Sequence, residues 1–181
     1  MRCQYCDTAY AFDGGEIQSI DDILQTISQY KCGYVTVTGG EPLAQPNCSI
    51  LLERLCNAGY NVSLETSGAL NIGVVDPRVS VILDIKTPAS LESDKNLPEN
   101  ISKLKASDQV KFVICDRKDY EWSKAKMLQL GLPDRVDEIL MSPSTPDLQP
   151  IQLAEWILKD NLEVRMQLQL HKIIWGDKPG H

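Results

Sequence analysis

The chain has 181 residues, of which 43% are hydrophobic and 24% are charged, and its formal net charge is −7 at pH 7. This length and composition are typical of one globular domain with its own core, and we expect a single domain over residues 1–181. No apolar run approaches the roughly 20 residues that span a bilayer, and no basic block favours binding to a nucleic-acid backbone. Because nothing after Met1 resembles a signal peptide, we expect a cytoplasmic protein without a membrane or nucleic acid as direct partner.

Short β-rich runs alternate with longer helical patterns along the chain. Ser19 and Asp22 open the first helix in a capping-box pattern, and this helix is expected to run to about Lys31. Further helices are predicted at 50–58, 99–106, 117–130 and 150–159. Strands are predicted at 34–38, 61–66, 79–85, 109–115, 138–142 and 163–170, and the third of these is apolar enough to be buried on both faces. This alternation predicts an α/β fold with a mostly parallel sheet, either open or closed into a barrel.

Three of the predicted strands run directly into polar or glycine-rich segments. These segments are 38–42 (TGGEP), 65–68 (ETSG) and 84–88 (DIKTP). Turns use the same residue types, so each segment alone is compatible with an ordinary turn. The carboxyl ends of parallel strands meet at one edge of a sheet, where α/β folds carry their functional groups. Three such ends together favour a functional site at that edge.

Two of the six cysteines, Cys3 and Cys6, form a Cys-x-x-Cys motif near the start of the chain. Such a pair is compatible with half of a zinc site, a redox pair or iron–sulfur ligation. A zinc site requires a second Cys or His pair, for which the sequence offers only His171 and His181. A thioredoxin-like pair opens a helix, whereas the residues after Cys6 are typical of a loop. Iron–sulfur ligation remains, because thiolates are the usual protein ligands of such clusters.

A second motif, Gly39-Gly40-Glu41, follows the strand predicted at 34–38. Two glycines allow a ligand to approach the main chain closely. The main-chain groups and the Glu41 carboxylate can then bind an ammonium group. The alternative is a Gly-Gly turn with a solvated Glu41.

The two motifs together resemble the radical S-adenosylmethionine (SAM) superfamily, and finer detail is similar to the 7-carboxy-7-deazaguanine synthases from residue 2 to about residue 172. The segments that carry this resemblance are 2–10 (RCQYCDTAY), 38–42, 65–68 and 84–88. The resemblance implies a partial (β/α)6-type barrel and a lyase of queuosine biosynthesis. It implies a ring contraction that converts 6-carboxy-5,6,7,8-tetrahydropterin to 7-carboxy-7-deazaguanine with loss of ammonia.

The same resemblance implies three cofactors, namely a [4Fe–4S] cluster, SAM and Mg²⁺. Cys3 and Cys6 match two cluster ligands, and Thr8 matches the magnesium position. The residues matched to SAM are Tyr5 for the adenine, Gly39, Gly40 and Glu41 for the ammonium, Ser67 for the ribose or methionyl part, and Lys86 for the carboxylate. Thr38, Gly40 and His171 match substrate-binding positions, although a lone His on a strand is as often structural. Lys111 receives no role. The implied partners are the pterin substrate, an electron donor such as flavodoxin, and a second copy of the chain in a homodimer.

The family pattern has a further cysteine four positions before Cys3, and a strand before the cluster loop. The sequence contains neither, so we expect it to be N-terminally truncated with its first strand missing. Two alternatives stay open. Another small radical SAM enzyme, such as a glycyl-radical activase, shares the cluster, Gly-Gly-Glu and Asp-x-Lys features. A catalytically inactive interaction protein that retains the fold is the alternative if Met1 is the true start.

Overall fold

Six strands form one open sheet in the computed structural model, which describes residues 1–6, 8–11, 14–176 and 178. The strands, in their order across the sheet, are β1 Tyr34–Val37, β2 Asn61–Thr66, β3 Ser80–Asp84, β4 Gln109–Ile114, β5 Glu138–Pro143 and β6 Arg165–Met166. The helices are α1 Ile20–Ser28, α2 Cys48–Asn57, α3 Arg117–Gln129, α4 Pro150–Lys159 and α5 Leu170–Trp175. All neighbouring strands are parallel, which confirms the predicted α/β fold with a partial barrel.

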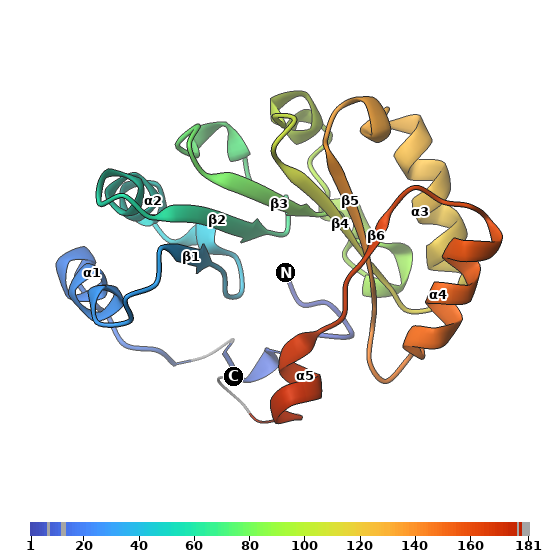
Figure 1. Ribbon diagram of the computed structural model, residues 1–181, viewed down its shortest axis with the longest axis horizontal. Coiled ribbons are helices and arrows are strands. Elements are labelled where there is room, and N and C mark those ends of the chain that lie inside the picture. The colour runs from blue at the N-terminus through green and yellow to red at the C-terminus, as the bar shows by residue number, and fades with distance from the viewer. Residues whose placement is uncertain (7, 12–13, 177, 179–181) are drawn as a thin grey trace.

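The sheet is curved like part of a barrel wall (Figure 1). Helices α2, α3 and α4 lie on its outer side, whereas α5 lies on the inner side, near the N-terminal segment. The functional groups at the strand ends therefore face a space that α5 and the N-terminal segment border. None of the described helices is long and apolar enough to cross a membrane.

Side-chain caps explain why two of the helices, α1 and α3, begin where the sequence predicts. The Ser19 hydroxyl accepts a hydrogen bond from the amide of Asp22 at 3.1 Å, and the Asp116 carboxylate accepts one from the amide of Asp119 at 2.8 Å. Each cap satisfies an amide that has no partner within its helix. Helix α1 ends earlier than predicted, because Lys31 has a positive φ of 47° and cannot continue a right-handed helix.

The outer face of the sheet carries the apolar core. Alternate side chains of β2 and β3 point to this face, and Val62, Leu64, Val81 and Leu83 are no more than 5% exposed. Burial of each such side chain stabilises the fold by about 1.5–3 kcal/mol relative to leaving it in water. The helices pack on this outer face. The inner face is not covered by them, so polar side chains can lie at the strand ends there.

The prediction that the strand at 79–85 is buried on both faces is wrong. Val81 and Leu83 are buried, but Ile82 and Asp84 are only partly buried. The apolar sequence of this strand suggests two covered faces, whereas the inner face of the open sheet borders a pocket. Its length is confirmed to within a residue at each end.

The last strand is much shorter than the prediction of 163–170, and His171 lies in α5 rather than on a strand. The amide of Gln167 donates to the carbonyl of Met141 at 3.0 Å. In a parallel ladder the next bond would come from the amide of residue 143 to the carbonyl of Gln167. That residue is Pro143, which has no amide hydrogen, so the ladder stops there. The chain then turns away from the sheet into α5.

The short helix predicted at 99–106 is a 3-10 helix, Pro98–Lys103. The fully buried Asn100 side chain donates to the carbonyls of Gly68 at 3.0 Å and Leu70 at 2.8 Å, and it accepts from the amide of Ile72 at 3.1 Å. These bonds hold the segment against the loop that follows β2. Asn100 therefore supports the loop that carries Ser67.

Candidate active site

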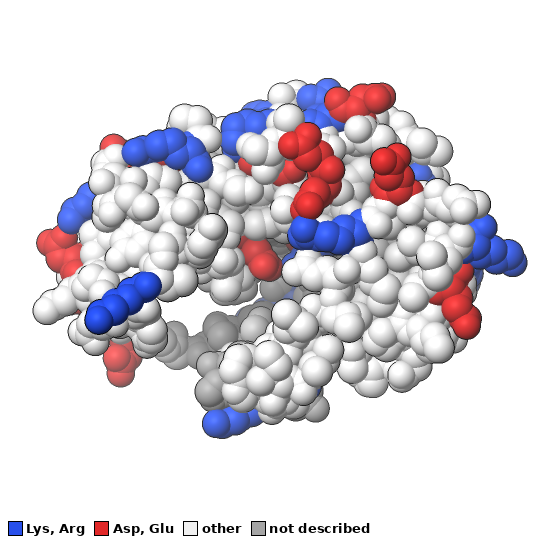
Figure 2. All heavy atoms as spheres, in the orientation of Figure 1, with Lys and Arg blue, Asp and Glu red and all other residues white. Residues whose placement is uncertain are grey.

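An open pocket of about 560 Å³ lies at the carboxyl ends of the strands, on the inner side of the sheet. Figure 2 shows this face of the molecule hollowed in its middle, with acidic and basic side chains mixed around the hollow. Every predicted site residue except Glu41 lines the pocket. These residues are Cys3, Tyr5, Cys6, Thr8, Thr38, Gly39, Gly40, Ser67, Lys86 and His171. Asp7, in the predicted cluster loop, and His181 lie outside the described residues.

The N-terminal loop is held at the pocket by main-chain bonds. The amide of Gln4 donates to the carbonyl of Ser90 at 3.2 Å, and the amide of Arg2 donates to the Glu92 carboxylate at 2.9 Å. Both cysteines of the motif are free thiols, and the amide of Cys6 donates to the carbonyl of Cys3 at 3.1 Å. This turn brings the two thiols to the same pocket.

The environment of the loop favours neutral groups over anions. Burial raises the pKa of the Cys3 thiol above its ordinary value, although the nearby Lys86 ammonium opposes this. Burial, with the nearby Asp84 carboxylate, also raises the pKa of Tyr5, which stays a neutral phenol. The Cys6 sulfur lies 3.5 Å from the Thr8 hydroxyl, so the predicted magnesium position is next to the predicted cluster position.

The described residues fit a [4Fe–4S] cluster only in part. Cys3 and Cys6 line the pocket, whereas Cys48 is buried in the core at the start of α2. Cys32 is exposed, and its thiol contacts the carbonyl of Tyr34. Within the described ranges, no three His, Cys, Asp or Glu side chains are placed to hold one metal ion. The described part of the chain therefore places two free thiols, those of Cys3 and Cys6, at the pocket.

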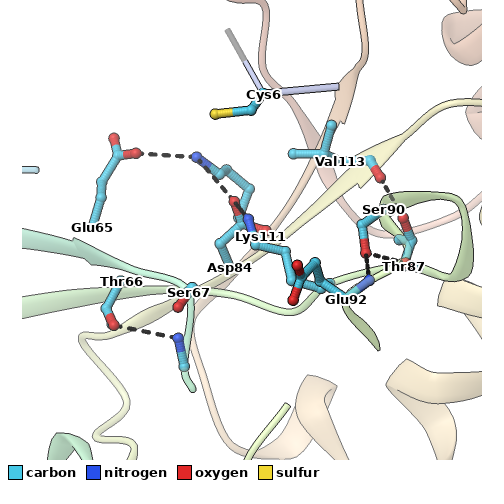
Figure 3. Close-up of polar contacts among 12 residues, drawn as sticks. Cys6, Glu65, Thr66, Ser67, Asp84, Thr87, Ser90, Glu92, Lys111 and Val113 are labelled. Atoms are coloured by element: carbon cyan, nitrogen blue, oxygen red, sulfur yellow. Dashed lines mark hydrogen bonds and ion pairs between the residues drawn. The ribbon is translucent and has the colours of Figure 1, made fainter. Parts of the chain in front are cut away.

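Four charged side chains form a chain of ion pairs in the pocket, and Figure 3 shows three of them, Glu65, Lys111 and Asp84, near Cys6. The Lys111 ammonium lies 3.1 Å from the Glu65 carboxylate and 3.8 Å from that of Asp84. The Lys86 ammonium lies 2.9 Å from the same oxygen of Asp84. The other oxygen of Asp84 is buried and has no hydrogen-bond partner among the described residues. We call Glu65, Lys111, Asp84 and Lys86 the charge row.

Both lysines of the charge row remain protonated. Burial opposes their charge, but it is outweighed by neighbouring groups, chiefly Asp84 for both residues and also Glu65 for Lys111. The pKa of each lysine is therefore raised above its ordinary value of 10.5. An ammonium at Lys86 that is only 12% exposed can pair with an anionic ligand group in the pocket.

Glu41 lies beside the pocket rather than on its surface. Its carboxylate accepts hydrogen bonds from the amide of Leu43 at 3.1 Å and the Thr66 hydroxyl at 2.8 Å. It also accepts from Ser67, through the amide at 2.9 Å and through the hydroxyl. Gly39, by contrast, lines the pocket with a φ of +146°, a conformation that favours glycine.

Sequence reasoning missed part of the charge row. It gave Lys111 no role, and it quoted Glu65 and Asp84 in motifs without assigning them. The available signal is the alternation of strand side chains, because Glu65 in β2 lies two positions before Ser67, which directly follows that strand. Lys111 pairs in register with Asp84 across β3 and β4, a relation that no single strand reveals.

The C-terminal segment also lines the pocket. Gln167, Gln169 and His171 line it, and the Lys172 ammonium donates to the carbonyl of Thr145 at 3.2 Å. A second cavity, of about 220 Å³, lies on the outer side between β3 and α3. Its lining is mainly apolar and includes the charged Lys126, whereas Cys3, Cys6 and the charge row line the first pocket.

Comparisons with known proteins identify the family of the chain. The model of the Radical SAM superfamily matches residues 1–84. A 7-carboxy-7-deazaguanine synthase of Koribacter versatilis is 40% identical over 97% of this chain and 84% of its own length. One from Chlorobaculum tepidum is 42% identical over 96% of this chain and 80% of its own length.

Solved structures share the fold at lower identity. The crystal structure of QueE from Escherichia coli matches with a TM-score of 0.71 and 20% identity, over 92% of this chain and 79% of that one. The structure of Streptococcus suis SuiB bound to a precursor peptide matches with a TM-score of 0.65 and 13% identity, over 92% of this chain and 45% of that one. These similarities concern the fold. The sequence relatives decide the family: the chain belongs to the 7-carboxy-7-deazaguanine synthases, which are radical SAM enzymes that use a [4Fe–4S] cluster and SAM.

Proposed function

We propose that the pocket at the strand ends is where this chain converts 6-carboxy-5,6,7,8-tetrahydropterin to 7-carboxy-7-deazaguanine with loss of ammonia. One observation carries the assignment. In a chain of this family, the two thiols, the Gly39-Gly40 main chain and the Lys86 ammonium line one pocket. The chemistry supplied by the bound cluster and SAM is reductive cleavage of the sulfonium and abstraction of hydrogen from the substrate.

The residues at one side of the pocket suit the amino-acid part of SAM. Lys86 supplies a protonated ammonium for the SAM carboxylate, and a charge-assisted hydrogen bond of this kind contributes about 1.5–3 kcal/mol. Gly39 and Gly40 leave their main chain open to the SAM ammonium, because no atom lies within 4 Å of where a Cβ would be. Tyr5 would contact the adenine, and Ser67 would contact the ribose or methionyl part.

The other side of the pocket suits the pterin. Thr38, Gly40 and His171 bind the substrate, and the polar Gln167 and Gln169 beside His171 offer further donors and acceptors. Thr8 would hold Mg²⁺ through its hydroxyl, because this hard cation takes oxygen ligands such as hydroxyl and carboxylate groups. An external one-electron donor, such as flavodoxin, supplies the electron. The net reaction removes ammonia and requires no external oxidant.

An anaerobic turnover assay tests this proposal. The protein is reconstituted with iron and sulfide and incubated with SAM, dithionite, Mg²⁺ and the tetrahydropterin, and products are identified by mass spectrometry. We expect 7-carboxy-7-deazaguanine from the wild type and at least tenfold less from Lys86→Met. Lys103→Met is the matched control, because Lys103 is exposed and bonds Asn71 away from the pocket.

Two results would contradict the proposal in different ways. Cleavage of SAM without consumption of the tetrahydropterin would favour another radical SAM reaction, such as glycyl-radical activation. A protein that takes up neither iron nor sulfide would favour an interaction protein that retains the fold.

A further inference from the structure

The four hydrogen bonds to Glu41 join the ends of β1 and β2. A carboxylate offers about four acceptor sites. Leu43 and Thr66 take one oxygen of Glu41, and the amide and hydroxyl of Ser67 take the other. The carboxylate is therefore saturated by donors of the chain itself.

The donors on β2 are buried as well as bonded. Thr66 is 2% exposed and Ser67 is 8% exposed, and both follow the last apolar residue of a central strand. Two hydroxyls and one amide from these residues meet Glu41 in a place where water has little access. Bonds to a charged acceptor are strong under such conditions, and an unpaired donor there is costly.

Glu41 is bonded directly after the two glycines whose main chain lines the pocket. It is the N-cap of the 3-10 helix Pro42–Ala44, with φ −139° and ψ 102°. Neither Gly39 nor Gly40 has a side chain that could fix its own conformation. The conformation of these two glycines is therefore restrained by the next residue, Glu41, whose side chain bonds to the end of β2.

We propose that Glu41, Thr66 and Ser67 form a clamp that positions the Gly39-Gly40 main chain for the SAM ammonium, and that the Glu41 carboxylate itself does not contact the ammonium. This inference rests on the proposed function, since it assumes that SAM occupies the pocket. It makes Glu41 and Thr66 positioning residues. It assigns the contact with the ammonium to main-chain carbonyls of the turn.

The first test needs no cofactor. Amide hydrogen exchange is measured by mass spectrometry on peptides that cover residues 38–45 and 66–70. We expect exchange to be at least tenfold faster in Glu41→Gln and Thr66→Val than in the wild type. Ser63→Ala is the matched control, because the Ser63 hydroxyl bonds Thr36 at 2.8 Å and joins the same two strands away from the pocket.

The second test is equilibrium binding of SAM to the reconstituted protein. We expect Glu41→Gln and Thr66→Val each to raise the Kd of SAM about tenfold. The double variant should bind only slightly more weakly than either single variant, because both changes open the same clamp. Ser63→Ala should leave the Kd within twofold of the wild type.

The outcomes separate the clamp from the proposed function. A higher Kd in Glu41→Gln with no change in Thr66→Val would show that the carboxylate contacts SAM directly, and would overturn the clamp. Unchanged exchange in both variants would also overturn it. A wild-type protein that binds no SAM would instead overturn the proposed function, and the clamp would then have no SAM ammonium to position.

Discussion

Replacement of Lys111 by Met removes the central cation of the charge row. Lys111 is 16% exposed and lies 3.1 Å from Glu65 and 3.8 Å from Asp84. At an effective dielectric constant of about 20, unit charges at such separations attract by roughly 4–5 kcal/mol. Glu65 is 38% exposed, so solvent weakens the attraction between Glu65 and Lys111. The free-energy cost of removing Lys111 from water offsets part of its attraction to Asp84. We expect Lys111→Met to lower the free energy of unfolding by about 2 kcal/mol.

Urea unfolding at pH 7 measures this loss. For a domain of this size, about 2 kcal/mol corresponds to a fall in Tm of roughly 4–8 °C. Lys111→Arg keeps the charge and should recover most of the loss, while Lys103→Met controls for the removal of an exposed lysine. Asp84 remains in the variant, with Lys86 as its one ion-pair partner among the residues that the structure describes. If Lys111→Met unfolded within about 0.5 kcal/mol of the wild type, the charge row would not be a stabilising network.

Three further predictions concern other parts of the molecule. Gly68→Ala should lower the free energy of unfolding in urea by about 2–4 kcal/mol, because φ is +70° and a Cβ would lie 2.7 Å from the Leu83 side chain. Gly131→Ala is the control and should cost only about 1 kcal/mol, because its φ of +60° is similar but the space around it is open. Equal losses in the two variants would contradict the packing argument. The raised pKa of Lys111 means that its stabilising charge is fully present below pH 10.5 and is lost as the pH rises through the raised value. Tm should therefore fall above pH 10.5, and less steeply in Lys111→Met; parallel curves would refute this. Thr8→Val should remove the stimulation of turnover by Mg²⁺, measured by titration of the metal, and an unchanged half-saturating concentration would exclude Thr8 as a ligand.

The elements that sequence reasoning predicted well are those fixed by local chemistry. The strand at 61–66 and the helix at 150–159 have the predicted bounds, because alternation and an initial Pro150 specify them locally. The strand at 163–170 failed because its length depends on Pro143 of the neighbouring strand. Such a constraint between strands is invisible in the sequence of either strand alone.

The site residues, like the helices and strands, divide into those that local sequence reveals and those that depend on which strands are neighbours. Every site residue indicated by the resemblance and the motifs, except Glu41, lines the pocket, because glycines, cysteines and strand-end charges are recognisable one by one. The role of Lys111 and the bonds that saturate Glu41 depend on which strands become neighbours. Glu41 and Thr66 are 25 residues apart in the chain, yet their side chains bond at 2.8 Å.

The position of bound SAM decides whether these residues have the proposed roles. An anaerobic crystal structure of the reconstituted protein with SAM and the tetrahydropterin tests this directly. We expect the SAM ammonium against the main chain of Gly39 and Gly40, its carboxylate at Lys86, and the pterin between Thr38 and His171. SAM bound elsewhere on the molecule, or a pterin on the far side of the sheet from α5, would contradict the account.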